Sequence, residues 1–158
     1  MSFLNDLQFS QTQHTRLADV YKRLGIIQLM ETTKAQRQQT AVDYLGITST
    51  GIIRLVERHR RSRYRNYSDI TLRYQRAVGA TEYVNLYRCT IECQDPIWYI
   101  YTVNDKYVII NIRTLYEGIE NSLIDFQVKM NRDEASSFAI FSLSALKNIG
   151  AVILEGDI

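Results

Sequence analysis

Apolar residues recur every three or four positions over residues 11–24, a pattern that predicts an amphipathic helix ending at Gly25. A second helix is expected to begin at Lys34, because Thr33 and Gln36 have the spacing of a capping box. A third helix is expected to follow Gly46. The apolar positions of the first helix are Leu17, Val20, Tyr21 and Leu24.

The second half of the chain predicts an antiparallel β-meander. Residues 97–103 and 106–112 are rich in β-branched and aromatic residues, and Asn104 and Asp105 between them tolerate the positive φ angles of a two-residue hairpin turn. A turn at residues 94–96 would join a preceding strand over residues 83–93. Both faces of this sheet are apolar, so we expect helices or a second copy of the chain to cover them.

Two helices and a last strand are predicted after the meander. The second of these helices would begin at Asp133 and Glu134, whose negative charge suits a helix N-terminus, and would end at Gly150. Residues 151–154 are apolar and β-branched and predict a strand that joins the meander. The apolar positions are Leu115, Ile119, Leu123 and Phe126 in the first helix and Phe138, Phe141, Leu143, Ala145 and Leu146 in the second.

Residues 69–76 are compatible with two structures. Apolar and polar residues alternate there, which favours a strand paired with residues 83–93. Such a hairpin would be a wing from which Arg73 and Arg76 contact a nucleic-acid backbone. However, Ser68 could cap a helix and Gly79 could end it, so the sequence leaves both structures open.

Residues 38–61 have the pattern of two helices hinged at a glycine. Gly46 would supply the turn and Thr48 the N-cap of the second helix. This spacing resembles the helix-turn-helix superfamily of DNA-binding domains over 24 residues, although Val42 stands where the superfamily commonly has the smaller alanine. An ordinary helical hairpin is the alternative. The apolar anchors would be Ala41, Val42, Leu45, Ile47, Ile52 and Leu55.

The resemblance implies a recognition helix that enters the major groove of duplex DNA. Its N-terminus and outward face would contact base edges. The residues expected to read bases are Thr48, Ser49, Thr50 and Arg54.

The charge distribution supports a polyanionic partner. Residues 1–80 carry 13 Lys and Arg against 6 Asp and Glu, whereas residues 81–158 carry 6 against 11. Arginine can grip a phosphate with two hydrogen bonds, and such contacts would set orientation and affinity without reading sequence. The residues expected to bind phosphates are Lys34, Arg37, Arg58, Arg60, Arg61, Arg63 and Arg65.

These patterns together predict an α+β fold with two units. Residues 1–66 would be a basic three-helix helix-turn-helix unit, which is winged if residues 69–76 form a strand. Residues 67–158 would be an antiparallel β-meander with two helices and a final strand. The second unit would dimerise, bind a partner protein or sense a ligand. Dimerisation is expected because two half-sites multiply specificity for DNA.

Three classes of function remain open on this basis. The first is a sequence-specific duplex DNA-binding protein, such as a transcriptional regulator or a phage or mobile-element DNA-handling factor. The second is a protein-interaction module, an adaptor, inhibitor or assembly factor, whose basic face contacts an acidic partner. The third is a metal-dependent nuclease, for which Asp125 and Lys129 have the spacing of a short acid-and-lysine motif.

No cofactor or metal site is predicted. Cys89 and Cys93 would lie on one face of a strand, about 13 Å apart at ~3.3 Å per residue, which is too far for a disulfide. The N-terminus lacks the basic start and apolar core of a secretory signal, and the apolar runs are shorter than a membrane helix needs. We therefore expect an intracellular protein that is not embedded in a membrane.

Overall fold

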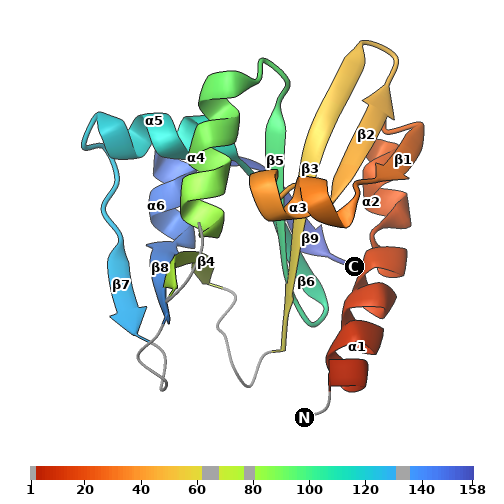
Figure 1. The fold of residues 1–158 in the computed structure, drawn as a ribbon, viewed down its shortest axis with the longest axis horizontal. Helices are drawn as coiled ribbons and strands as arrows, with labels where there is room; N and C mark the ends of the chain where they lie inside the picture. The colour runs from red at the N-terminus through yellow and green to blue at the C-terminus, as the bar shows by residue number, and fades with distance from the viewer. Residues whose placement is uncertain (1–2, 62–67, 77–80, 131–135) are drawn as a thin grey trace.

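The computed structural model describes residues 3–61, 68–76, 81–130 and 136–158 (Figure 1). The helices are α1 (Phe3–Arg16), α2 (Ala18–Arg23), α3 (Lys34–Thr40), α4 (Glu82–Glu92), α5 (Ile112–Glu120) and α6 (Leu143–Asn148). The strands are β1 (Gln28–Glu31), β2 (Tyr44–Thr48), β3 (Gly51–Arg60), β4 (Asp69–Arg76), β5 (Ile97–Val103), β6 (Lys106–Asn111), β7 (Gln127–Met130), β8 (Ser136–Ser142) and β9 (Val152–Asp157).

Within these residues the strands form two sheets. The larger has six strands in the order β1-β2-β3-β5-β6-β9, and the smaller has three in the order β4-β8-β7. β3 and β5 run parallel, whereas the other pairs are antiparallel. The predicted boundary at residues 66 and 67 lies outside the described residues, and strands from either side of it pair in the larger sheet.

Helices cover both faces of the larger sheet, which is one of the two coverings that the sequence left open. The helices α1 and α2 lie on one face, and α4, α5 and α6 lie on the other with the smaller sheet (Figure 1). Side chains alternate between the two faces because strand residues point to opposite sides in turn. On β5, Tyr99 and Tyr101 therefore join the core under α4, while Ile100 joins the core under α2.

Several local predictions are confirmed. The helix α3 begins at Lys34, with the Thr33 side chain accepting a hydrogen bond from the Gln36 amide as in a capping box. The β5–β6 hairpin turns at Asn104, whose φ is 51°. The strand β9 joins the sheet beside β6. Of the two structures that the sequence left open for residues 69–76, the strand is present.

The predicted three-helix unit is wrong. The helices α1 and α2 are one helix bent at Leu17, and residues 44–60 form a β-hairpin instead of a helix-turn-helix. The β-branched residues of this segment fit a pleated sheet better than a helix. Gly46 lies in the middle of β2, where an added Cβ would meet the Leu55 side chain at 3.2 Å, so it allows close packing and not a turn.

The turn of this hairpin lies at Ser49 and Thr50. The Thr48 hydroxyl accepts hydrogen bonds from the amides of Thr50 and Gly51. Thr48 therefore caps a turn between two strands, and it is not the N-cap of a recognition helix. Gly51 has a φ of 153°, a conformation that side chains disfavour.

The meander and the wing are also corrected. Residues 82–92 form helix α4, whose N-terminus is capped by Thr81. Consequently β4 pairs with β8 and forms no wing, and the larger sheet is mixed. Cys89 and Cys93 are free thiols one helical turn apart and do not lie on a strand.

The last predicted helix is only partly present. Residues 136–142 form strand β8, and the helix α6 begins at Leu143 and is followed by Gly150 with a φ of 74°. Asp133 and Glu134 lie outside the described residues. Phe138 and Phe141 are buried, but on a strand.

Arg113 ties the end of α4 to α5. Its guanidinium donates hydrogen bonds to the carbonyls of Thr90 in the last turn of α4 and of Cys93 and Asp95, which follow the helix. The carbonyls at a helix C-terminus have no partner within the helix. Arg113 therefore satisfies three of the acceptors in this connection.

We expect Arg113→Ala to lower the free energy of unfolding by about 2 kcal/mol, because it leaves these carbonyls without their charged donor. Urea unfolding would measure the change. As a control, Arg88→Ala removes an exposed arginine from α4 itself and should cost less than about 0.5 kcal/mol. Equal losses for the two variants would contradict this role of Arg113.

Candidate functional site

A pocket of about 720 Å³ lies between α1, α3 and the adjoining parts of β2 and β3. Its volume is in the range of small-molecule and cofactor sites. Both histidines of the chain line it, together with acidic and arginine side chains. The polar residues on which the argument depends are His14, Asp43, Glu57, Arg58, His59 and Arg60.

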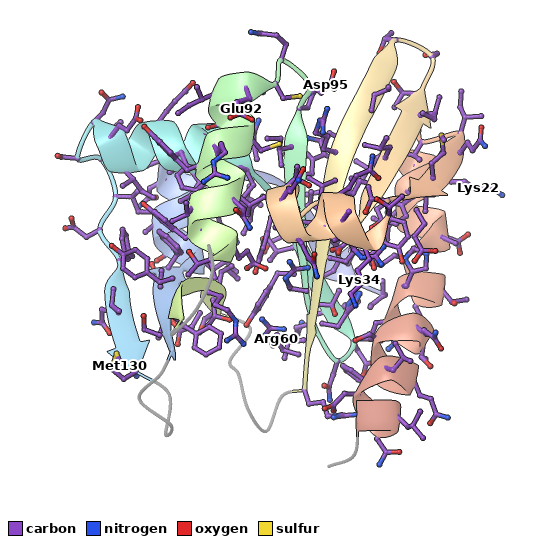
Figure 2. The ribbon with its side chains drawn as sticks, viewed as in Figure 1. Lys22, Lys34, Arg60, Glu92, Asp95 and Met130 are labelled. Atoms are coloured by element: carbon purple, nitrogen blue, oxygen red, sulfur yellow. The ribbon has the colours of Figure 1, made fainter. Side chains whose placement is uncertain are left out.

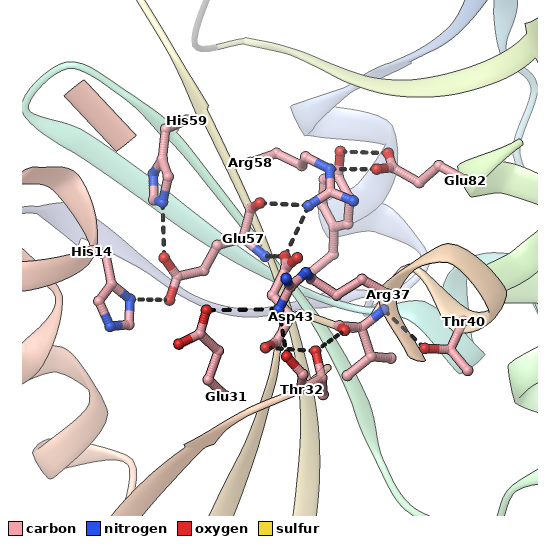
Figure 3. A network of polar contacts seen from close by, with 12 residues as sticks. His14, Glu31, Thr32, Arg37, Thr40, Asp43, Glu57, Arg58, His59 and Glu82 are labelled. Atoms are coloured by element: carbon pink, nitrogen blue, oxygen red, sulfur yellow. Dashed lines mark hydrogen bonds and ion pairs between the residues drawn. The ribbon is translucent and has the colours of Figure 1, made fainter. Parts of the chain in front are cut away.

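The buried carboxylate of Glu57 is the centre of this site (Figure 3). Its side chain is only 4% exposed. It accepts hydrogen bonds from His14 Nδ1 at 2.7 Å, His59 Nε2 at 2.8 Å and the Tyr21 hydroxyl at 2.6 Å. The donors come from α1, β3 and α2, so this one carboxylate joins the bent N-terminal helix to the sheet.

The strand period explains how these groups meet. Leu55, Glu57 and His59 alternate along β3 and so point to the same face, towards α1 and α2. His59 lies opposite Thr102 of β5 in the parallel register, and His59 Nδ1 is 2.7 Å from the Thr102 hydroxyl. Both ring nitrogens of His59 are therefore engaged, and its orientation is fixed.

The surrounding groups keep Glu57 ionised. Burial by itself raises the pKa of a carboxyl group, but the hydrogen bonds from His14 and His59 outweigh it and lower the pKa of Glu57 to about 2. The hydrogen bond to Glu57 in turn raises the pKa of His14 above 6.5, against the opposing effect of its own burial. A protonated His14 beside an ionised Glu57 is thus favoured near neutral pH.

A second ionic cluster lies beside the first. Arg58 pairs with Asp43 at 2.8 Å and with Glu82 of α4. Burial opposes the charge of Arg58, but Glu82 and Asp43 raise the pKa of its guanidinium. Burial also raises the pKa of Asp43, and Arg58 offsets part of that rise. Arg58 is therefore neutralised by two carboxylates and serves mainly to order the wall of the pocket.

His14 is the member of the cluster that faces the pocket. Its side chain is 30% exposed, and its Nε2 has no hydrogen-bond partner among the described residues. The imidazole stacks on Tyr44 with ring centroids 4.5 Å apart and planes 9° apart. Arg37 and Arg60 also line the pocket. The Arg37 guanidinium pairs with Glu31 at 3.6 Å, and the Arg60 guanidinium lies 6.0 Å from the centroid of the Tyr101 ring, on the other face of β3 from His59.

The described residues offer no ready metal site. No group of three or more His, Cys, Asp or Glu residues among them is placed to hold a metal ion. Asp43 and Glu57 are neighbours, because Asp43 Oδ2 accepts the Glu57 amide at 2.9 Å. Their oxygens already accept N–H and O–H donors, which a cation would have to displace.

The predicted DNA-contacting residues fall into separate groups. Thr48, Ser49 and Thr50 form the β2–β3 turn, and Arg54 pairs with Asp95 at 3.4 Å. In Figure 2, Asp95 lies near the top of the view, and Arg60 lies well below it. Arg60 follows Arg54 by six positions along β3, so the two residues are about 20 Å apart at ~3.3 Å per residue.

The predicted phosphate-binding residues are likewise only partly together. Arg37, Arg58 and Arg60 meet at the pocket, whereas Arg61 pairs with Asp6 of α1 at 2.7 Å. Lys34 is exposed at the start of α3 (Figure 2). Arg63 and Arg65 lie outside the described residues.

The residues of the nuclease hypothesis lie elsewhere. Asp125 and Lys129 are exposed, and Lys129 is on the edge strand β7, where the sequence predicted a helix. Neither lines the pocket.

Sequence reasoning missed the meeting of the two histidines. Once β3 is treated as a strand, its alternation places Glu57 and His59 on one face. This part of the cluster could therefore be predicted from the local sequence pattern. His14 is 43 residues from Glu57, and no spacing rule connects them. Only the docking of α1 on the sheet reveals the site.

Comparisons with protein-family models, with curated proteins and with solved structures find no match to this chain. Among the helices of the described residues, none combines the length and apolar character needed to cross a membrane.

Because His14 and Glu57 form an ionised pair, we expect the stability of the folded protein to depend on pH. The pKa of His14 is raised in the folded state, so its contribution is complete below pH 6.5 and is lost as the pH rises through the raised value. The pKa of Glu57 is lowered from 4.5 to about 2, so its contribution is complete above pH 4.5 and is lost as the pH falls. The pair contributes most between these limits.

We expect the wild-type free energy of unfolding to decline as the pH rises above about 6, by an amount that His14→Gln removes. Urea unfolding at several pH values would measure both curves. Lys34→Gln, which deletes an exposed positive charge next to α3, should keep the wild-type decline. Parallel curves for wild type and His14→Gln would contradict the ion pair.

Proposed function

We propose that the protein is a nucleic-acid phosphodiesterase whose catalytic pocket lies between α1 and β3. In this proposal His14, oriented by Glu57, transfers a proton to the reacting phosphodiester, and Arg37 and Arg60 contact its phosphate. The proposal replaces groove reading by a helix-turn-helix, because the segment expected to form that motif is a β-hairpin.

One observation carries the proposal. Two histidines from distant parts of the chain converge on one buried carboxylate, and one of them presents a ring nitrogen to a pocket. A carboxylate that accepts a hydrogen bond from one imidazole nitrogen orients the ring and stabilises its protonated form. Strongly shifted pKa values in a pocket are typical of functional sites, although structural ion pairs also produce them.

The chemistry of the pocket suits proton transfer to a leaving group. Water attacks phosphorus, the bond from phosphorus to the leaving oxygen breaks, and that oxygen takes the Nε2 proton of His14. The proton released from the attacking water passes to solvent, from which His14 is recharged. Because the pKa of His14 is raised, the protonated form that can donate this proton is favoured relative to an unperturbed histidine.

Charge supports a nucleic acid as the substrate. Residues 1–80 carry the excess of Lys and Arg, and the lining residues of the pocket all come from the described part of this half, with three arginines and two histidines beside three carboxylates. Guanidinium groups match the geometry of phosphate oxygens and remain charged at all physiological pH values. Duplex DNA, the partner predicted from the sequence, remains a candidate, and the pocket itself gives no preference for one base sequence.

The direct test is cleavage of fluorescently labelled duplex DNA, single-stranded DNA and RNA by the purified protein. We expect His14→Gln and Glu57→Gln to slow cleavage by roughly 10²- to 10⁴-fold, the usual contribution of general acid–base catalysis. Asp125→Ala and Lys129→Ala should leave the rate unchanged, because both residues are exposed and lie outside the pocket.

The reaction is run in parallel in EDTA and in Mg²⁺. Cleavage in EDTA that depends on His14 supports proton transfer without a metal. Cleavage that needs Mg²⁺ and Glu57 but not His14 would contradict the proton-transfer role, because Glu57 would then act on the cation. No cleavage of any substrate in either buffer would overturn the proposed function.

A further inference from the structure

We infer that Tyr44 is a positioning residue of this pocket, which holds the imidazole plane of His14 by stacking so that Nε2 stays directed into the cavity. The catalytic consequence rests on the proposed function. The structural claim stands on the geometry of the two rings and can be tested without a substrate.

Tyr44 belongs to the rigid part of the site. It is the first residue of β2, and it lies opposite Leu55 of β3 on one side and Glu31 of β1 on the other. The preceding residue, Asp43, donates its amide to the Leu55 carbonyl at 2.9 Å. Backbone pairing on both sides therefore fixes the main chain from which the tyrosine ring projects.

His14 belongs to a less firmly held element. Among the described side chains of α1, only Gln13 is buried, so little apolar packing fixes this helix against the sheet. Polar contacts hold it instead, including Gln13 with the Asn104 carbonyl and Arg16 with Asp105. Small shifts of α1 are thus opposed mainly by hydrogen bonds and ion pairs.

A single hydrogen bond does not fix a ring plane. The bond from His14 Nδ1 to Glu57 leaves the imidazole able to pivot about the line joining the two atoms. The Tyr44 ring, with its centroid 4.5 Å away and its plane within 9° of parallel, removes that freedom. Together the two contacts determine where Nε2 points.

The stack also favours the protonated form of His14, because a cation over an aromatic face is attracted by the ring quadrupole. The carboxylates around His14 are Glu57 on β3, Glu31 on β1 and Asp43 beside β2, and all three raise its pKa. The arginines that line the same pocket are Arg37 on α3 and Arg58 and Arg60 on β3. Burial raises the pKa of Tyr44 to about 12, so its ring stays neutral while His14 titrates.

Three substitutions separate the ring from its hydroxyl. Tyr44→Phe keeps the stack, whereas Tyr44→Ile and Tyr44→Gln remove it. Isoleucine and glutamine can both be accommodated at this position of strand β2. NMR titration of the His14 ring protons then gives its pKa in each variant that folds.

We expect the pKa of His14 to be unchanged in Tyr44→Phe and lowered in the two variants without a ring. The limb of the cleavage pH profile that follows His14 should move by the same amount, and the cleavage rate at neutral pH should fall about tenfold in the ringless variants only. A His14 pKa and a pH profile identical to wild type in a folded ringless variant would overturn the inference. If the wild-type protein cleaves nothing, the proposed function fails, and the NMR titration still decides whether Tyr44 positions His14.

Discussion

The carboxylate of Glu57 is almost completely buried, and the position of the N-terminal helices follows from the hydrogen bonds that this carboxylate accepts. An ionised carboxylate in a protein interior must be paired and hydrogen-bonded, because its desolvation is costly. Its three donors come from α1, α2 and β3. Since α1 has little apolar contact with the sheet, this pairing and the contacts of Gln13 with Asn104 and of Arg16 with Asp105 specify where its C-terminal half docks.

The same pairing gives the pocket its chemistry. His59 and Tyr21 hold Glu57 from within the core, so the carboxylate stays ionised, and His14 is the one partner of the three with a substantial exposed surface. Arg58 orders the adjoining wall through Asp43 and Glu82 without adding a free charge. The site therefore combines a rigid buried anion with a titratable cation on a separate helix, an arrangement suited to proton transfer.

Features with short-range causes could be predicted from the sequence. The capping box before α3, the β5–β6 turn and the β9 strand depend on residues close together in the chain. The β2–β3 hairpin was misassigned because Gly46 resembles a helix hinge, whereas its packing against Leu55 requires tertiary structure. The helix α4 could not be distinguished from a strand in the sequence, because its apolar residues fit both structures equally. The docking of His14 on Glu57 depends on the whole sheet being formed.

The central claim is that Glu57 and His14 form an ionised pair, and NMR titration of His14 in the wild type and in Glu57→Gln tests it most directly. With Glu57 present, the pKa of His14 should lie above 6.5. With glutamine in its place, the charge is gone while burial remains, so the pKa of His14 should fall. The same His14 pKa in both proteins would contradict the account, because the histidine would then titrate independently of the buried carboxylate.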